Sequence, residues 1–230
     1  LAGSTSTGST NATGTSARFR YPRGITTDGT NLYVADTDNH RIRKIVISSG
    51  AVTTIAGSGS TGNADGTGTA ATFQYPRGIA TDGKNLYVAN TNRQSIRKII
   101  ISSGVVTTLA GSGHANQTGS TNGTGTAARF KNPRGITTDG TNLYVADYNN
   151  HMIRKIVIST GVVTTLAGGT GTSAGFNGPM DIVIDGTNLY VADYGNHKIR
   201  KIALRGTLTA DVKLHNLDDD TDATVSLASS

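Results

Sequence analysis

The sequence contains no cysteine, no tryptophan and no glutamate, so all 15 acidic residues are aspartate. Without cysteine the chain forms neither disulfides nor thiolate metal sites. No apolar run approaches the roughly 18 residues that a membrane-spanning helix needs, so we expect no membrane partner. Because glutamate favours helices while the abundant glycine, aspartate and asparagine favour turns, the composition predicts many short strands joined by turns.

Positive charge is concentrated in the first 210 residues. They carry 20 basic and 10 acidic side chains, a net charge of +10. Residues 211–230 carry five aspartates and one lysine, and we expect an acidic polar tail or linker there. A basic body attracts nucleic acid, anionic glycans or an acidic protein surface, although a soluble domain with a high isoelectric point is the simpler interpretation.

Four copies of one sequence pattern fill most of the chain. The first copy reads FRYPRGITTDGTNLYVADTDNHRIRKIVISSGAVTTIAG, and the other copies follow it closely. Each copy contains one of the only four prolines, which stand at positions 22, 76, 133 and 179. Turn residues divide the first copy into four strand candidates, at residues 24–28, 31–36, 42–47 and 52–57.

The second strand of each copy is apolar on both faces. In the first copy Leu32 and Val34 point one way, while Tyr33 and Ala35 point the other. A strand that is apolar on both sides must lie between two neighbouring layers. Radially stacked blades provide that environment, and a single four-stranded sheet does not.

The repeated pattern P-x-G-I…D-G-x-N-L-Y-V-A-D-x-x-N-H-x-I-R-K-I…V-T-T-L-A-G resembles the NHL-repeat family. The resemblance implies an all-β fold, a β-propeller of four-stranded antiparallel blades, of which four NHL-type blades are present. The family includes RNA-binding, protein-binding and extracellular bacterial propellers and a lyase, so the resemblance leaves the activity open. The expected propeller covers residues 1–210, with blades near residues 19–57, 73–111, 130–168 and 176–212.

The first three residues, Leu1-Ala2-Gly3, match the end of the fourth strand of a copy, as in residues 109–111. Two arrangements fit this start. In one, the chain is the C-terminal part of a longer propeller, such as a six-bladed one. In the other, four blades close alone and residues 1–3 complete the last blade. Residues 207–212 suit a fourth strand for the last copy, which favours the first arrangement.

We expect binding on the face that carries the linkers between copies. These linkers are rich in glycine, serine and threonine, and they are either adaptable hydrogen-bonding loops around a ligand or insertions that tolerate change. They comprise residues 4–18, 58–72, 112–129 and 169–175.

An arginine stands at the start of the first strand in three copies. That strand is innermost in a propeller, so the arginines would surround the mouth of the central channel. Three guanidinium groups there attract phosphate, sulfate or carboxylate. The alternative is solvated side chains too far apart to act together. The predicted ligand-binding residues are Arg23, Arg77, Arg134 and, in the fourth copy, Met180.

The turns between the second and third strands carry the pattern D-x-x-N-H in three copies. Aspartate and histidine bind metals, but each histidine belongs to a different blade. We therefore expect Asx turns and no metal site. As surface groups beside the linkers, these residues are further candidates for binding. They are Asp36, His40, Asp147, His151, Asp193 and His197.

Two more sets recur once per copy. An Arg-Lys pair in the third strand, Arg43-Lys44 in the first copy, must direct one basic side chain toward the neighbouring blade. We expect it to pair with the aspartate that ends the second strand; the alternative is an outer basic belt for nucleic acid. Aspartates before glycine suit either turns or Ca²⁺ binding, and turns are the simpler interpretation. They are Asp28, Asp82, Asp139 and Asp185.

No arrangement in the sequence is typical of a catalytic site, because the copies lack the asymmetry that catalysis requires. We predict a non-catalytic binding or scaffolding propeller without cofactors, bacterial and extracellular, that engages a protein or glycan through the linker face. An RNA- or polyanion-binding propeller is the alternative, and a propeller lyase or hydrolase is the third. Because a partial propeller exposes strand edges, we also expect a homo-oligomer or completion by missing blades.

Overall fold

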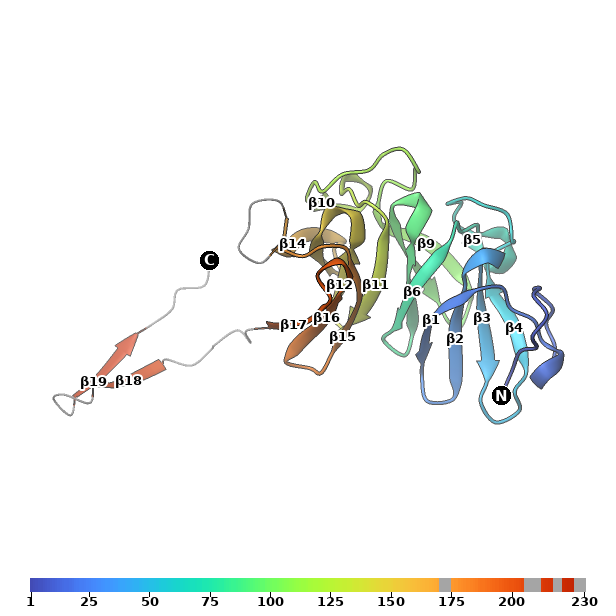
Figure 1. The fold of residues 1–230 in the computed structure, drawn as a ribbon, viewed down its shortest axis with the longest axis horizontal. Helices are drawn as coiled ribbons and strands as arrows, with labels where there is room; N and C mark the ends of the chain where they lie inside the picture. Colours follow the sequence, from blue (N-terminus) through green and yellow to red (C-terminus); the bar gives the residue numbers. More distant parts are fainter. Residues whose placement is uncertain (170–174, 205–211, 217–220, 226–230) are drawn as a thin grey trace.

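The computed structural model describes residues 1–169, 175–204, 212–216 and 221–225, which form β-strands and short 3₁₀ turns. No helix in this part of the chain is long and apolar enough to cross a membrane. One four-stranded, two five-stranded and one three-stranded sheet stand side by side in these residues and make four blades (Figure 1). The all-β propeller prediction is confirmed.

Blade 1 consists of β1 (Pro22–Thr27), β2 (Asn31–Asp36), β3 (Arg41–Val46) and β4 (Val52–Ala56), paired antiparallel in that order. The turn between β1 and β2 contains Gly29, whose φ of 88° suits glycine. The connection from β2 to β3 is the 3₁₀ turn η2 (Thr37–Asn39), which ends at His40 in the left-handed conformation.

The other blades repeat this order. Blade 2 contains β6 (Pro76–Thr81), β7 (Asn85–Asn90), β8 (Ser95–Ile100) and β9 (Val105–Gly111). Blade 3 contains β11 (Pro133–Thr138), β12 (Asn142–Asp147), β13 (Met152–Val157) and β14 (Val162–Gly168). Blade 4 contains β15 (Pro179–Ile184), β16 (Asn188–Asp193) and β17 (Lys198–Ala203). Most of the fourth strand predicted for it, residues 207–212, lies outside the described residues.

The linkers are built into the blades. The linker before blade 2 adds β5 (Gly66–Thr67) to the outer edge of β9, and the linker before blade 3 adds β10 (Gly123–Thr124) to β14. These residues are therefore part of the sheets. The role predicted for the linkers in ligand binding stays a prediction.

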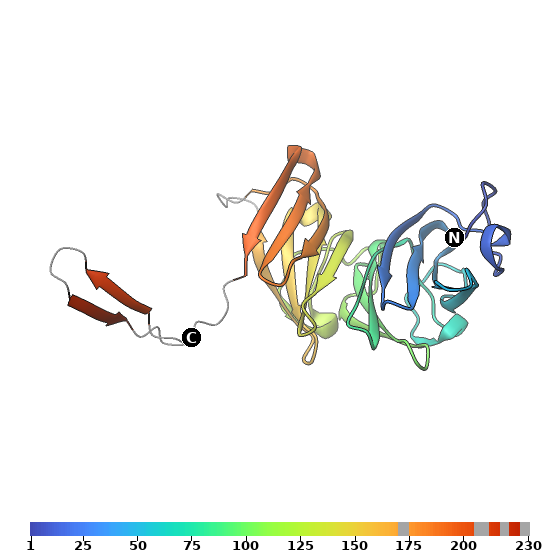
Figure 2. The same ribbon diagram turned by 90° about the horizontal axis from the view of Figure 1, so that it is seen from below.

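The inner strands β1, β6, β11 and β15 lie next to one another, as the two views show (Figures 1 and 2). A glycine after the arginine in each of the first three strands permits this approach. A side chain at Gly24 would collide with the backbone of Arg77, and one at Gly78 would collide with the backbone of Arg134. The same glycines therefore bring the arginines together.

Consecutive blades bury an apolar interface. Tyr33, Ala35 and Ile42 of blade 1 pack against Phe73 and Val88 of blade 2, and all five are fully buried. We call the side of a blade that packs onto the next blade its forward face, and the side that is covered by the preceding blade its receiving face. The equivalent residues of the later blades form the same interface, so the predicted sandwiching of the second strand is confirmed.

The two ends of the described arc are open. β1 and β15 do not pack against each other in the way that neighbouring inner strands do. Ile25, on the receiving face of blade 1, is 60% exposed, whereas its equivalent in blade 2, Ile79, is 6% exposed. Ile199, on the forward face of blade 4, is 76% exposed, whereas its equivalent in blade 3, Ile153, is fully buried.

Residues 1–3 lie against the linker of blade 1. The amide of Gly3 donates to the carbonyl oxygen of Gly14 at 3.0 Å, just as the amide of Gly57 donates to that of Gly68 at 3.1 Å. Residues 1–3 thus occupy, against blade 1, the place that the end of β4 occupies against blade 2. In the described residues the sheet of blade 4 consists of β15, β16 and β17, and residues 1–3 do not pair with it. The choice between the two predicted arrangements stays a prediction.

The C-terminal residues contain a hairpin where we expected a tail or linker. β18 (Val212–Asn216) and β19 (Thr221–Val225) pair with each other antiparallel. Alternating apolar and polar residues on both sides of an aspartate-rich stretch explain the pairing, and the acidic composition concealed that pattern.

Candidate functional site

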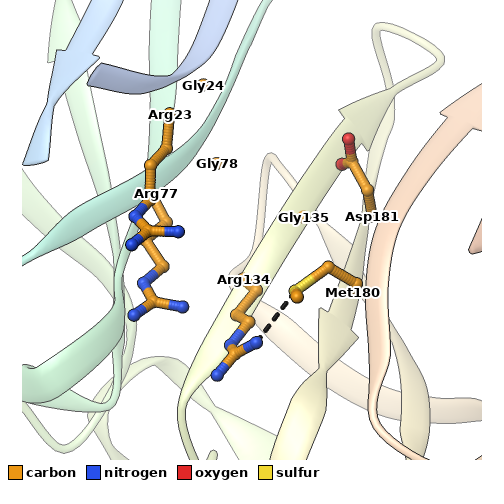
Figure 3. Close-up of a pocket in the computed structure, with 8 residues that line it drawn as sticks. All are labelled: Arg23, Gly24, Arg77, Gly78, Arg134, Gly135, Met180 and Asp181. Carbon is orange, nitrogen blue, oxygen red and sulfur yellow. Dashed lines mark hydrogen bonds between the residues drawn. The ribbon is translucent and has the colours of Figure 1, made fainter. Parts of the chain in front are cut away.

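The predicted arginines surround one pocket. It has a volume of about 190 Å³ and opens where the inner strands begin. In Figure 3 the three guanidinium groups point to the same side, while the carboxylate of Asp181 points away from them. The structure therefore brings together all four residues that the sequence predicted, and their role in binding stays a prediction. The pocket is lined by Arg23, Gly24, Arg77, Gly78, Arg134, Gly135, Met180 and Asp181.

Arg77 is the least satisfied cation of this pocket. Its side chain is half-buried, and among the described residues it has neither an ion pair nor a hydrogen-bond partner. Burial, followed by the charges of Arg134 and Arg23, lowers the pKa of Arg77 to about 10. Arg77 is still protonated at neutral pH, so its positive charge is partly desolvated and not neutralised.

Arg134 is held in place without a carboxylate. Its guanidinium lies over the ring of Tyr148, 3.3 Å from the centroid, and its Nη1 donates to the sulfur of Met180 at 2.8 Å. Burial lowers the pKa of Arg134, and the charge of Arg23 adds to this effect. These contacts fix the position of the cation and leave its charge unpaired.

The arginines of the third strands have the opposite environment. Arg43 is fully buried, donates to Asp36 at 2.8 Å and lies over the ring of Phe19. It also donates to carbonyl oxygens of Arg18 and Thr10 in the linker. The predicted pairing with the aspartate that ends the second strand is confirmed in three blades, by Arg43–Asp36, Arg154–Asp147 and Arg200–Asp193.

The placement of three aspartates on the surface is wrong. Asp36, Asp147 and Asp193 are fully buried, because each carboxylate neutralises the arginine of its own blade. Each also accepts from the backbone amide two residues before the proline of its blade, as Asp36 does from Arg20 at 2.7 Å. Buried carboxylates of this kind hold the blade together and are not available to a partner.

Two of the three predicted histidines connect neighbouring blades. Nδ1 of His40 accepts from the amide of Tyr75 at 3.2 Å, and Nδ1 of His151 accepts from the amide of Gly178 at 2.9 Å. In blade 2, Gln94 does the same with its side-chain oxygen. Burial lowers the pKa of His40, which favours the neutral form that can accept this hydrogen bond. Only His197, in blade 4, is exposed as predicted.

The four aspartates before glycine cap their turns, as the simpler interpretation predicted. Asp28 accepts from the amides of Thr30 and Asn31 and from the hydroxyl of Tyr33 at 2.8 Å. Burial is the largest single effect on the pKa of Asp28 and raises it, but these hydrogen bonds and one from the side chain of Asn31 together outweigh it, so the pKa lies well below its usual value. The same contacts recur at Asp82, Asp139 and Asp185.

The repeated blades and their inner ring of strands define a β-propeller protein. A family model described as "NHL repeat" matches residues 19–45. NHL repeat-containing protein 2 of Homo sapiens is 33% identical over 165 residues, which are 65% of this chain and 22% of that protein. SUPPRESSOR OF QUENCHING 1 of Arabidopsis thaliana is 31% identical over 62% of this chain and 14% of its own length. The chain thus contains a match to the NHL repeat and is similar to NHL repeat-containing proteins, and it spans less than a quarter of the length of these curated relatives.

Solved structures share the propeller fold. An auxiliary nutrient binding protein of Bacteroides thetaiotaomicron matches with a TM-score of 0.61 at 21% identity, over 77% of this chain and 46% of that one. A catalytically inactive virginiamycin B lyase of Staphylococcus aureus, solved with quinupristin, matches with a TM-score of 0.54 at 17% identity, over 88% and 54%. At these identities the likeness concerns the fold alone.

Proposed function

We propose that this chain is a non-catalytic binding module whose arginine mouth, the pocket between Arg23, Arg77 and Arg134, holds an anionic group of a larger partner. The observation that carries the proposal is the environment of Arg77, a half-buried guanidinium with two more arginines beside it and no carboxylate partner among the described residues. An anion placed among the three would neutralise charges that the fold has partly removed from water.

The dimensions of the mouth favour one anionic group over a whole small molecule. Its volume of about 190 Å³ is smaller than that of most pockets that enclose drug-sized ligands, roughly 300–1,000 Å³. A carboxylate or sulfate that projects from a protein loop or a glycan fits such a volume. Arginine suits either group because its planar fork donates two parallel hydrogen bonds.

The alternative, an RNA- or polyanion-binding surface on the outer belt, has less support. The belt was predicted from the Arg-Lys pairs of the third strands, but Arg43, Arg97 and Arg154 are fully buried. The lysines of those pairs and Arg200 remain at least partly exposed. The bacterial and extracellular setting stays a prediction.

The test compares two triple variants of equal charge. Arg23→Ala/Arg77→Ala/Arg134→Ala removes the mouth, and Lys44→Ala/Lys98→Ala/Lys155→Ala removes three cations from the third strands. Calorimetric titration would use three probes: an oligoglutamate peptide, a sulfated glycan and a single-stranded RNA. We expect the mouth variant to bind the peptide or the glycan at least about tenfold more weakly, since it loses charge-assisted hydrogen bonds.

The lysine variant should bind within about threefold of the original chain, because exposed charges contribute little individually. Equal losses in both variants would show that the affinity depends on net charge alone. Binding only of RNA, with a steep dependence on salt, would support the alternative instead.

A further inference from the structure

The third contact between blades uses a different pair of residues from the first two. At the first two, a threonine that opens the 3₁₀ turn donates to the proline carbonyl of the next blade, Thr37 to Pro76 at 2.7 Å and Thr91 to Pro133 at 2.8 Å. At the third, the turn η6 (Tyr148–Asn150) opens with Tyr148. A tyrosine ring needs more space than a threonine, and the next blade must provide it.

Gly178, the residue before Pro179, provides that space. A Cβ at this position would lie 2.9 Å from Cε2 of Tyr148, closer than real Cβ atoms come to a ring. The backbone does not explain the glycine. The equivalent residues Tyr21, Tyr75 and Asn132 adopt almost the same left-handed φ, between 46° and 53°, compared with 60° for Gly178. The glycine at position 178 is therefore explained by its packing against the ring of Tyr148 and not by its backbone conformation.

Blade 4 presents the same tyrosine on its open forward face. Tyr194 opens the turn η7 (Tyr194–Asn196) at the position of Tyr148, and its side chain is 60% exposed. Ile199 on this face is 76% exposed, whereas Ile153 in blade 3 is covered by blade 4. His197 stands at the position of His151, whose Nδ1 accepts from the amide of Gly178, and among the described residues no donor reaches His197. All three features match one half of an interface between blades.

The other open end of the described arc does not match it. The receiving face of blade 1 has Tyr21, 63% exposed, at the position of Gly178. If blade 1 of a second copy packed onto blade 4, Tyr194 would meet a tyrosine where Tyr148 meets a glycine. The structure thus contains two pairings that fit, threonine with a large residue and tyrosine with glycine, and the two open ends would form neither.

We propose that the forward face of blade 4, with Tyr194, His197 and Ile199, docks a further NHL-type blade that has glycine immediately before the proline of its first strand. Tyr194 selects the glycine and excludes the first blade of a second copy. Tyr194, His197 and Ile199 do not line the pocket of the arginine mouth, and the proposal does not depend on the proposed function.

Self-association of the full chain tests the selection. Tyr21→Gly gives blade 1 the glycine that Tyr194 requires, and Tyr194→Thr gives blade 4 the threonine that accepts a tyrosine. Both residues are exposed, so we expect both variants to fold, which thermal unfolding would verify. In sedimentation velocity over a concentration series, each single variant should associate head to tail at least about tenfold more tightly than the original chain.

The double variant, Tyr21→Gly/Tyr194→Thr, should gain less than either single variant, because threonine against glycine leaves a gap. Equal association of all four chains, or no association of either single variant, would overturn the proposal. An additive gain in the double variant would also overturn it, since that result requires no specific pairing.

A second cycle tests the pairing rule inside the chain. Gly178→Tyr should lower the urea midpoint of unfolding, because the new ring collides with Tyr148. Adding Tyr148→Thr should restore at least half of the loss by recreating the residues found between blades 1 and 2, where Thr37 opens the turn and Tyr75 precedes the proline. If the double variant is no more stable than Gly178→Tyr alone, the pairing rule is wrong.

Discussion

Two sets of arginines recur along the blades, one in all four third strands and one in the first strands of blades 1 to 3, and their environments are opposite. Arg43 and Arg154, in the third strands, are fully buried and each donates to a carboxylate. Arg77 and Arg134, in the first strands, are half-buried and have no carboxylate among the described residues. The same residue type therefore stabilises the blade in one place and offers an unpaired charge in the other. Repetition alone does not tell the two roles apart, but charge pairing does.

Blade 2 shows that the buried set requires charge neutralisation and tolerates a change of position. Its second strand ends at Asn90, and the carboxylate for Arg97 comes from Asp65 in the linker, at 2.8 Å. In blade 3 the linker residue at the equivalent position is Asn122, whose side-chain oxygen accepts from Arg154, and the strand supplies the carboxylate of Asp147. Each arginine thus receives one carboxylate, although from different segments. Within the described residues no carboxylate neutralises the mouth in this way.

Arg154→Ala gives the strongest test of whether the buried arginines, unlike the mouth arginines, stabilise the fold. This change leaves the buried carboxylate of Asp147 without its partner, so we expect unfolding to become easier by about 3–5 kcal/mol in urea titrations. Arg134→Ala is the matched control and should cost far less. A loss for Arg154→Ala as small as that of the control would mean that the buried set is not structural.

Moving the carboxylate of blade 3 from the strand to the linker should change stability less than Arg154→Ala does. Asp147→Asn removes the carboxylate but keeps an acceptor, and we expect it to cost about 1.5–3 kcal/mol of unfolding free energy. Adding Asn122→Asp copies the arrangement of blade 2 and should recover at least half of the loss. The same urea titration measures both variants. A double variant that is no more stable than Asp147→Asn would show that a linker carboxylate does not replace the strand carboxylate.

The mouth should contribute little to stability. The triple variant Arg23→Ala/Arg77→Ala/Arg134→Ala removes three like charges that have no carboxylate partner among the described residues. We expect its unfolding free energy to lie within about 1 kcal/mol of the original value. A destabilisation comparable to that of Arg154→Ala would place the mouth arginines in the structural set.

The smallest expected effect is the pH dependence at His40. Burial lowers its pKa from the ordinary value near 6.5, so between the two pKa values the unfolded chain binds more protons than the folded chain. Stability should therefore fall as the pH drops below about 6.5 and through the lower pKa of the folded state. His40→Gln keeps an acceptor, as Gln94 does in blade 2, and should flatten that part of the curve. Identical pH profiles for the two proteins would contradict this account.

The fold could be predicted from the sequence because four copies repeat the same pattern of strands and turns. Apolar residues on both faces of the second strand, such as Leu32 and Tyr33, require neighbours on both sides, and turn residues mark the strand ends. The positions of the mouth arginines followed from the innermost place of the first strand. The C-terminal hairpin was missed because its acidic composition is also typical of a tail.

Other features of the site depend on contacts that the sequence does not show. The pairing of Asp36 with Arg43 was predicted, but Asp36 was still expected on the surface, because the full burial of both side chains depends on contacts with the linker. The roles of His40 and Gln94 as acceptors between blades need the left-handed turn and the neighbouring blade together. The sequence did contain a signal for the role of Asp65. Asn90 stands where the other three copies have an aspartate, so the carboxylate for Arg97 had to come from another segment.

The central claim is that the mouth arginines, unlike the buried ones, accept an external anion. The most direct measurement follows the side-chain Nε–H resonances of the arginines by NMR while sulfate is added at constant ionic strength. The account predicts saturable shifts at Arg23, Arg77 and Arg134 and none at Arg43, Arg97 and Arg154. Shifts that are equal in both sets, or no saturable shift at Arg77, would contradict it.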